Sequence, residues 1–133
     1  MIKKEAQQNP RVLIIQKLYS HYLNKESQII FPKHRYRKYI KDVVNGVIER
    51  NELIQKVIDK ELSDNININK TELIVKLIIV AAIYEFMYMH KIPIKVVINE
   101  YLKASNLFIG IKQKKFLNAI LDKASKVCRV TNI

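Results

Sequence analysis

The chain has 133 residues and a mass of 15.7 kDa, which is enough for one compact domain with a substantial core. Hydrophobic residues make up 49% and charged residues 27%, with only 2 Gly and 3 Pro, so the composition argues against a disordered chain and against a turn-rich β fold. The formal charge of +12 favours an anionic partner such as nucleic acid or a membrane surface, although AT-rich coding alone also enriches a chain in Lys, Ile and Asn.

The sequence predicts a cytoplasmic protein. Cys128 is the single cysteine, which excludes a disulfide framework and fits a reducing compartment. The first eight residues are polar and charged and lack the apolar core of a secretory signal. The longest apolar run, Leu77 to Tyr84, is much shorter than the ~20 residues that span a bilayer.

Three amphipathic helices are predicted in the first half of the chain. Asn9 followed by Pro10 is typical of a helix start, and apolar residues then recur at spacings of three and four. The periodicity lapses from Asn24 to Pro32 and returns in a second pattern, in which we expect Gly46 to allow close helix packing. The apolar positions of the three helices are Val12, Ile15, Leu18, Tyr19 and Tyr22; then Tyr36, Tyr39, Ile40, Val43, Val44 and Val47; and then Leu53, Val57, Ile58 and Leu62.

Three more helices are predicted in the second half. Asn69 and Glu72 form a cap-like start to a long helix through Met89, which is apolar nearly all round and is therefore expected to lie centrally. Pro93 opens the next helix and Gly110 ends it. The apolar positions of the last two helices are Val97, Tyr101, Ala104 and Phe108, and then Phe116, Leu117, Ile120, Leu121 and Ala124.

Six helical patterns and no strand pair predict an all-α fold. We expect a single domain over residues 1–133, divided into three-helix subdomains at about residues 9–62 and 69–128. The Ser, Asp and Asn residues of segment 63–69 are typical of a linker.

The residue types that catalysis needs are not brought together by the sequence. The three histidines fall in different segments without a ligand partner at i+3 or i+4, so no metal site is expected. The two glycines are isolated, which excludes a phosphate-cradling loop. Glu85, Glu100 and Asp122 are interpreted as helix-packing and capping partners. The sequence therefore predicts neither an enzyme nor a cofactor.

Two basic stretches are candidates for contact with phosphates. The first stretch carries Lys33, Arg35, Arg37, Lys38 and Lys41 with no acid between them. The second, residues 91–133, has nine basic residues against two acidic ones. Aromatic residues are interleaved in both and either stack on unpaired bases or belong to the core, and periodicity favours the core for Tyr101 and Phe108. A helix-turn-helix DNA reader and a membrane-surface helix are weaker alternatives, because the chain shows neither a recognition face nor a bulky exposed apolar face.

A set of ordered motifs runs through residues 11–129. The first helix carries Arg11, Gln16, Leu18 and Tyr19. The second half carries, in register and without gaps, Tyr84-Glu85, Pro93, Ile98-Asn99-Glu100, Lys115-Phe116, Asn118, Leu121 and Asp122. In these residues the chain resembles the NusB family of transcription antitermination factors.

The resemblance implies a NusB-like bundle of two roughly perpendicular three-helix subdomains, without catalysis. It also implies binding to boxA-type single-stranded RNA of ribosomal RNA leader transcripts, together with the small-subunit ribosomal protein NusE, in a complex that modifies elongation by RNA polymerase. The RNA-binding residues that it implies are Arg11, Gln16, Tyr19, Lys112, Lys115 and Phe116.

The implied RNA face joins the starts of the first and last helices. Arg11 and Lys115 are expected to contact phosphates, with Lys112 adding charge. Gln16 is expected to read a base edge. An aromatic ring, that of Tyr19 or Phe116, is expected to stack on a base, with core packing as an equal alternative for both.

Two departures from the family bear on these expectations. The family's arginine-rich amino terminus is reduced here to Lys3, Lys4 and Arg11, which predicts a shallower salt dependence of RNA binding. Val75 stands where the family has an acidic residue that faces its ribosomal-protein partner, and Val80 stands where the family usually has an arginine. The partner contact is therefore expected to be more apolar or rearranged.

Three alternatives remain open at this level. The chain is either an antitermination factor, the NusB-like RNA-binding portion of an RNA cytosine methyltransferase, or a helical interaction protein without RNA specificity. A homodimer that masks a basic face is a further open alternative, because sequence alone does not define the oligomeric state.

Overall fold

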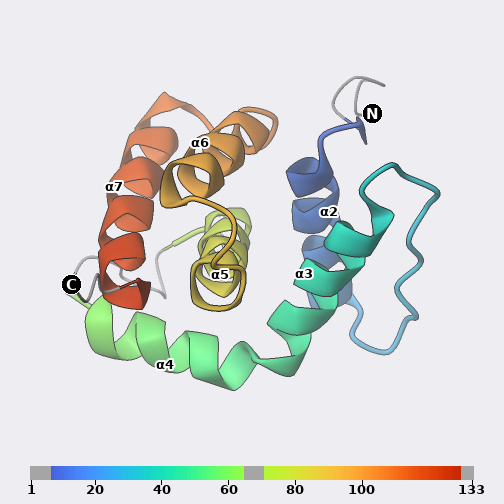
Figure 1. The fold of residues 1–133 in the computed structure, drawn as a ribbon, viewed down its shortest axis with the longest axis horizontal. Coiled ribbons are helices and arrows are strands. Elements are labelled where there is room, and N and C mark those ends of the chain that lie inside the picture. Colours follow the sequence, from blue (N-terminus) through green and yellow to red (C-terminus); the bar gives the residue numbers. More distant parts are fainter. Residues whose placement is uncertain (1–6, 65–70, 130–133) are drawn as a thin grey trace.

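The computed structural model describes residues 7–64 and 71–129, and every regular element in this part of the chain is a helix (Figure 1). This confirms the predicted all-α fold. The predicted linker, residues 63–69, lies mostly outside the described residues. The helices are α2 (Pro10–Leu23), α3 (Arg37–Glu49), α4 (Asn51–Glu61), α5 (Leu73–Tyr88), α6 (Ile94–Ser105) and α7 (Ile111–Cys128).

The helix starts follow from local capping chemistry. The side chain of Asn9 accepts a hydrogen bond from the backbone N–H of Arg11 at 3.0 Å, and Pro10 occupies the first helical position, as predicted. Helix α5 begins at Leu73 with Glu72 at its N-cap, whereas the predicted cap Asn69 lies outside the described residues.

The prediction that Gly110 ends α6 is wrong, because Gly110 instead begins α7. Helix α6 stops at Ser105, because the backbone N–H groups of Phe108 and Ile109 both donate to the carbonyl of Ser105 and tighten the chain into a turn. Gly110 then takes the N-cap position of α7, where its N–H donates to the Gln113 side chain at 3.4 Å. Phe108 therefore belongs to the connection between α6 and α7.

Helix α5 is the centre of the molecule, which confirms the prediction from its apolar composition. It packs against α2, α3, α4, α6 and α7 and is surrounded by them in Figure 1. A helix that is apolar on all sides is stable only when all sides are buried. The two halves of the chain consequently share one continuous hydrophobic core.

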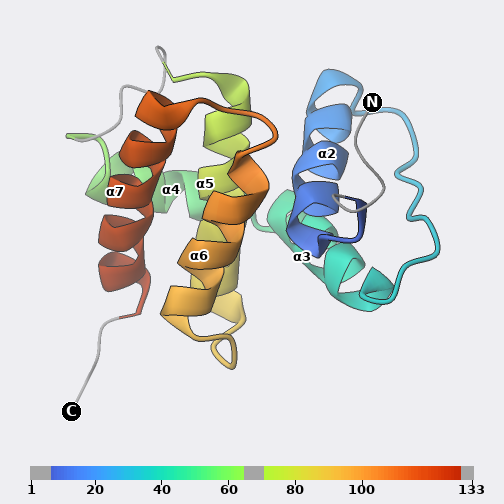
Figure 2. The same ribbon diagram turned by 90° about the horizontal axis from the view of Figure 1, so that it is seen from above.

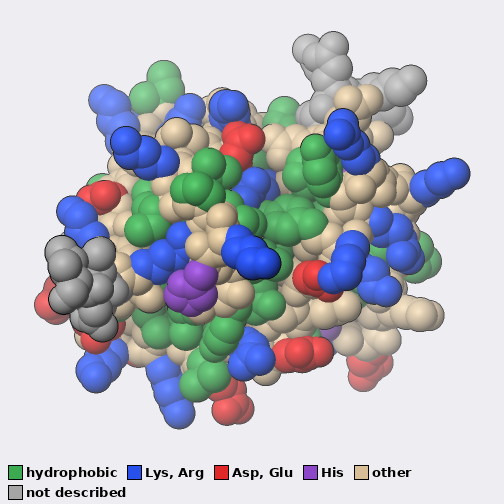
Figure 3. Space-filling view, in the orientation of Figure 1, with side chains coloured by type: hydrophobic (Ala, Val, Ile, Leu, Met, Phe, Trp, Pro, Cys, Tyr) green, Lys and Arg blue, Asp and Glu red, His purple; other side chains and the backbone are tan. Residues whose placement is uncertain are grey.

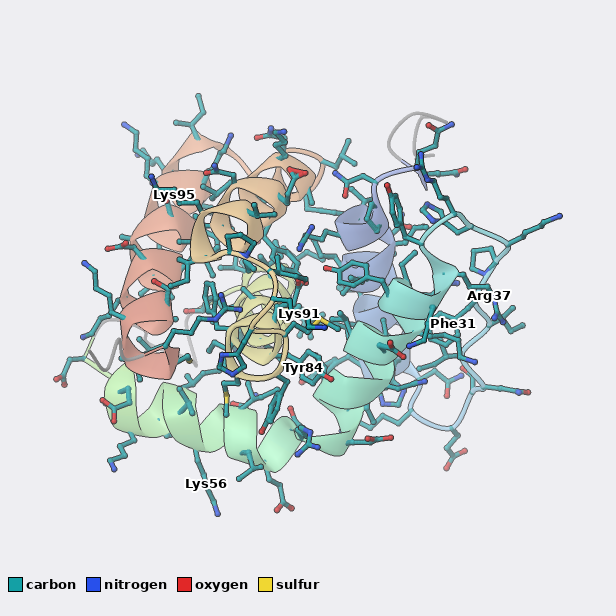
Figure 4. All side chains as sticks on the ribbon, in the orientation of Figure 1. Phe31, Arg37, Lys56, Tyr84, Lys91 and Lys95 are labelled. Atoms are coloured by element: carbon teal, nitrogen blue, oxygen red, sulfur yellow. The ribbon has the colours of Figure 1, made fainter. Side chains whose placement is uncertain are left out.

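Gly46 allows α3 to approach α5 closely, as predicted. A Cβ atom at this position would overlap the phenol ring of Tyr84, and the ring occupies the space that the missing side chain leaves. Figure 4 shows Tyr84 between α5 and α3. The Tyr84 ring also contacts the Tyr88 ring, and the two ring centroids lie 5.1 Å apart.

Arg129 caps the C-terminal end of α5. Its guanidinium donates four hydrogen bonds of 2.6–3.0 Å to backbone carbonyls at and just beyond the end of the helix, and two of these carbonyls, those of Glu85 and Met89, also accept from a backbone N–H. The accepting carbonyls are those of Glu85, Phe86, Met89 and Ile92. This arginine belongs to the second basic stretch, which was predicted to contact phosphates, but it ties the end of α7 to the end of α5.

The connections place two segments beside α2. In Figures 1 and 2 the connection between α6 and α7 lies next to α2, and the long loop from residue 24 to residue 36 forms one edge of the molecule. The exposed side of α2 therefore lies between these two segments. No helix of the described chain is long and apolar enough to cross a membrane.

Candidate nucleic-acid interface

A groove of about 870 Å³ runs between the second half of α2, the start of α5 and the connection between α6 and α7. It is lined by Gln16, Lys17, Tyr19, Ser20, Glu72, Leu73, Ile74, Leu107 and Phe108. Two of the six predicted RNA-binding residues, Gln16 and Tyr19, line it. The Tyr19 side chain is 38% exposed, so its ring face is available to a base.

The start of α7 follows this groove along the chain. Lys112 and Lys115 are exposed on the first turns of the helix, and the first turn carries no acidic residue. The N-terminal end of a helix favours anions because its N–H groups are unpaired and its dipole is positive there. Phe116 is half-buried against the core, which leaves only part of its ring to a ligand.

Arg11 lies apart from the other predicted residues, in the interior. Its side chain is 8% exposed, and its Nη2 donates to Oε1 of Glu85 in an ion pair of 2.7 Å. The guanidinium makes cation–π contacts with the rings of Tyr39 and Tyr101, whose centroids lie 5.3 and 5.2 Å from Cζ. The phosphate contact expected of Arg11 does not fit this placement, because its charge already serves a buried partner.

The electrostatics of this buried cluster keep Arg11 charged and the phenols neutral. Burial by itself lowers the pKa of Arg11, but the charge and hydrogen bond of Glu85 together with the nearby Tyr101 and Tyr39 phenols hold the pKa above its usual value. Burial also raises the pKa of Tyr101 and of Tyr39 well above the usual value, and the charge of Glu85 adds to both shifts.

The cluster confirms the interpretation of Glu85 as a helix-packing partner. The ion pair joins α2 to α5 across 74 positions of sequence, and the two rings come from α3 and α6. No local pattern links residues so far apart. The signal that was present is an acidic residue, Glu85, in a helix whose only other charged residue is Lys76, since a carboxylate buried in such a helix requires a partner.

Val75 and Val80 are core residues. Their side chains are 2% and 4% exposed, so they do not form an exposed apolar surface in place of the family's charged residues. Val80 contributes to the floor of a second, half-enclosed groove of about 420 Å³ between α2, α3, α4 and α5. The rim of that groove is polar, with His21, Lys25, Asn51, Gln55 and Lys76.

Charge alone does not select either groove. Figure 3 shows Lys and Arg side chains spread over the whole visible face, with fewer Asp and Glu side chains among them. Within residues 7–64 and 71–129, no group of three His, Cys, Asp or Glu side chains is placed to hold a metal ion. The groove beside α2 is singled out by the predicted residues that it brings together.

The helices and their connections define a small all-α protein built around one central apolar helix. Comparison with known proteins identifies its family. The profile of the NusB family matches residues 3–126, which is nearly the whole chain. The chain therefore belongs to the NusB family, as the sequence motifs indicated.

Individual relatives agree with this assignment. The chain is 34% identical to the Transcription antitermination protein NusB of Buchnera aphidicola subsp. Cinara cedri, over 90% of each chain. It is 27% identical to the protein of the same name from Bradyrhizobium diazoefficiens, over 83% of this chain and 67% of the relative. The solved structure of T. maritima NusB has the same fold, with a TM-score of 0.74 at 20% identity, and the match covers 95% of this chain and 93% of that one.

Proposed function

We propose that this chain is an antitermination factor that binds boxA-type single-stranded RNA of ribosomal RNA leader transcripts. It acts together with the small-subunit ribosomal protein NusE and thereby modifies elongation by RNA polymerase. The observation that carries the proposal is the groove that joins Gln16 and Tyr19 of α2 to the connection that leads into Lys112 and Lys115 of α7.

The chemistry of this groove suits an unpaired RNA strand. A half-exposed tyrosine offers a stacking face, and a glutamine side chain can both donate to and accept from a base edge. The exposed lysines at the start of α7 neutralise phosphates without reading sequence. Phe116 is given a packing role beneath this surface, and Arg11 is assigned to the fold.

The partner is expected to strengthen RNA binding. With Arg11 engaged inside the molecule, few exposed arginines remain near the proposed face, and affinity for RNA alone depends on lysines and on stacking. A second protein that adds its own RNA contacts raises the affinity of the complex without requiring new contacts from this chain.

A fluorescence-anisotropy titration tests the proposal. A short boxA-type RNA and a scrambled control are each titrated with the chain, with and without the ribosomal protein, at two salt concentrations. We expect preference for the boxA-type RNA and an increase of that preference with the partner. Equal, salt-sensitive binding to both RNAs that does not change with the partner would contradict the proposal. It would indicate a non-specific polycation or an interaction protein without RNA specificity.

A further inference from the structure

The groove beside α2 does not end at Ser20. A small hollow of about 220 Å³ shares Lys17 and Ser20 with it and extends over His21 to the loop after α2. A third hollow, of about 600 Å³, shares His21 and residues 27–30 with the small one and reaches the start of α3. Because neighbouring hollows share lining residues, they form one continuous path around the exposed side of α2.

The far end of this path is cationic. The hollow at α3 is lined by Arg37 and Lys41 together with the neutral polar side chains of Ser27, Gln28 and Asn45, and no acidic side chain lines it. Such a lining offers hydrogen-bond donors and two positive charges to a ligand that carries negative charge along its length.

The two cations are placed to serve a ligand. Nε of Arg37 donates to the carbonyl of Phe31 at 3.2 Å, which anchors the guanidinium at the edge of the loop (Figure 4). Lys41 makes no ion pair within the described part of the chain, whereas the nearby Lys38 is paired with Asp42 at 2.8 Å. The charges of Arg37 and Lys41 are therefore not compensated by a neighbouring carboxylate.

An exposed aromatic residue, Tyr36, directly precedes Arg37 in the chain. The Tyr36 side chain is 45% exposed and precedes α3 directly. Cζ of Arg35 lies 5.4 Å from its ring centroid, and the His34 ring lies 6.0 Å away. Aromatic rings next to a basic groove are the arrangement that proteins use to hold single-stranded nucleic acid without reading its sequence.

We propose that this path carries the continuation of the RNA strand beyond the α2 and α7 face, with Arg37 and Lys41 contacting its phosphates. The inference rests on the proposed function and names a second segment of its binding site. A continuous path from a base-binding groove to a cationic end fits a flexible polyanion better than an acidic peptide, since only the former also uses the stacking faces of Tyr19 and Tyr36.

RNA length is the variable that tests this proposal. A boxA-type RNA is compared with the same RNA extended by about eight nucleotides, at the 5′ end and, separately, at the 3′ end. One of the extensions is expected to tighten binding and to steepen the salt dependence by about 1.4, since each neutralised phosphate of a single strand contributes about 0.7. In the double variant Arg37→Gln, Lys41→Gln the extension should no longer tighten binding or steepen the salt dependence. The affinity for the short RNA should be retained.

A matched control removes the same charge elsewhere. Lys56 and Lys60 lie exposed on α4 and line none of the three hollows, and Figure 4 shows Lys56 pointing away from the molecule. The double variant Lys56→Gln, Lys60→Gln should therefore keep the benefit of the extension. Circular-dichroism melting of both double variants verifies that each still folds.

The remaining outcomes separate the two proposals. If the chain bound the short RNA but gained no affinity from either extension, the proposed path would be wrong and the proposed function would stand. The same would follow if the α4 control variant lost the gain from the extension as fully as the Arg37 and Lys41 variant. Absence of binding to the short RNA would overturn both. A further comparison uses a polyglutamate peptide. If the Arg37→Gln, Lys41→Gln variant bound this peptide more weakly but bound both RNAs as before, the cationic end would be assigned to an acidic protein segment.

Discussion

Arg11 is the residue that most directly joins the helices of this molecule. A single guanidinium on α2 contacts a carboxylate on α5 and two rings, from α3 and α6. The carboxylate of Glu85 is fully buried, so burial is tolerated only because this partner compensates it. The pair is therefore a condition for the fold, whatever it contributes to RNA binding.

Removal of Arg11 should destabilise the protein strongly. We expect Arg11→Ala to lower the free energy of unfolding by about 3–5 kcal/mol, because it leaves the buried Glu85 side chain without its ion-pair partner. The double variant Arg11→Met, Glu85→Leu removes both charges and should lose much less. Urea denaturation measures both, and a double variant that is as unstable as the single one would show that the ion pair is not the cause.

The buried phenols make stability sensitive to alkaline pH. Burial raises the pKa of Tyr101 in the folded chain, whereas the unfolded chain keeps a tyrosine pKa of about 10. Above that pH the folded state holds a proton that the unfolded state releases, so stability falls as pH rises. Tyr101→Phe should reduce this fall by up to about 1.4 kcal/mol per pH unit, as measured by urea denaturation between about pH 9 and pH 11.

A phenol at the surface provides the control for this pH dependence. Tyr22 is 53% exposed, and Tyr22→Phe removes the same hydroxyl without touching the core. The alkaline loss of stability in this variant should match that of the unsubstituted chain. If Tyr22→Phe flattened the profile as much as Tyr101→Phe, burial of Tyr101 would not be the source of the effect.

At the scale of elements, the contact between α3 and α5 depends on the absence of a side chain at Gly46. Gly46→Ala should destabilise the fold by about 1–2 kcal/mol, because the new methyl group meets the Tyr84 ring and overpacking outweighs the gain in helix propensity. In a Tyr84→Ala background the same change should stabilise by about 0.5–1 kcal/mol, since only the helix propensity remains. Thermal melting of the four variants gives the sign in each background, and destabilisation in both would contradict the packing explanation.

The junction between α5 and α7 depends on Arg129. Arg129→Ala should cost about 2–3 kcal/mol, because the carbonyls of Phe86 and Ile92 lose their donor, while those of Glu85 and Met89 keep only a backbone N–H. Lys126→Ala is the comparison: it removes a surface pair with Asp122 at 3.1 Å and should cost less than about 1 kcal/mol. Equal unfolding midpoints for the two variants in urea would argue against the cap.

At the scale of the whole molecule, helical periodicity was sufficient to predict the architecture. The six helices, the N-cap at Asn9, the central position of α5 and the close packing at Gly46 each follow from local patterns, and the structure bears them out. The end of α6 was wrong by a few residues because Phe108 continues the apolar spacing while its backbone already forms a turn. Side-chain spacing does not report such a change in backbone hydrogen bonding.

The candidate site was predictable only in part. Gln16 and Tyr19 were selected by a family motif, and the structure brings them to one groove with residues of the α6 and α7 connection. The same motif also selected Arg11, whose neighbour in space is 74 positions away in sequence. Whether an arginine faces solvent or a buried carboxylate is decided by tertiary packing, which no local pattern records.

An NMR titration locates the RNA-binding face on the folded chain. The ¹⁵N-labelled chain is titrated with a short boxA-type RNA, and the shifts of backbone amides are followed. We expect the largest shifts on residues 16–20 of α2 and on residues 107–116, while the amides of α4 remain unchanged. Shifts centred on α4, or spread evenly over the chain, would contradict the assignment of the groove beside α2 as the RNA-binding face.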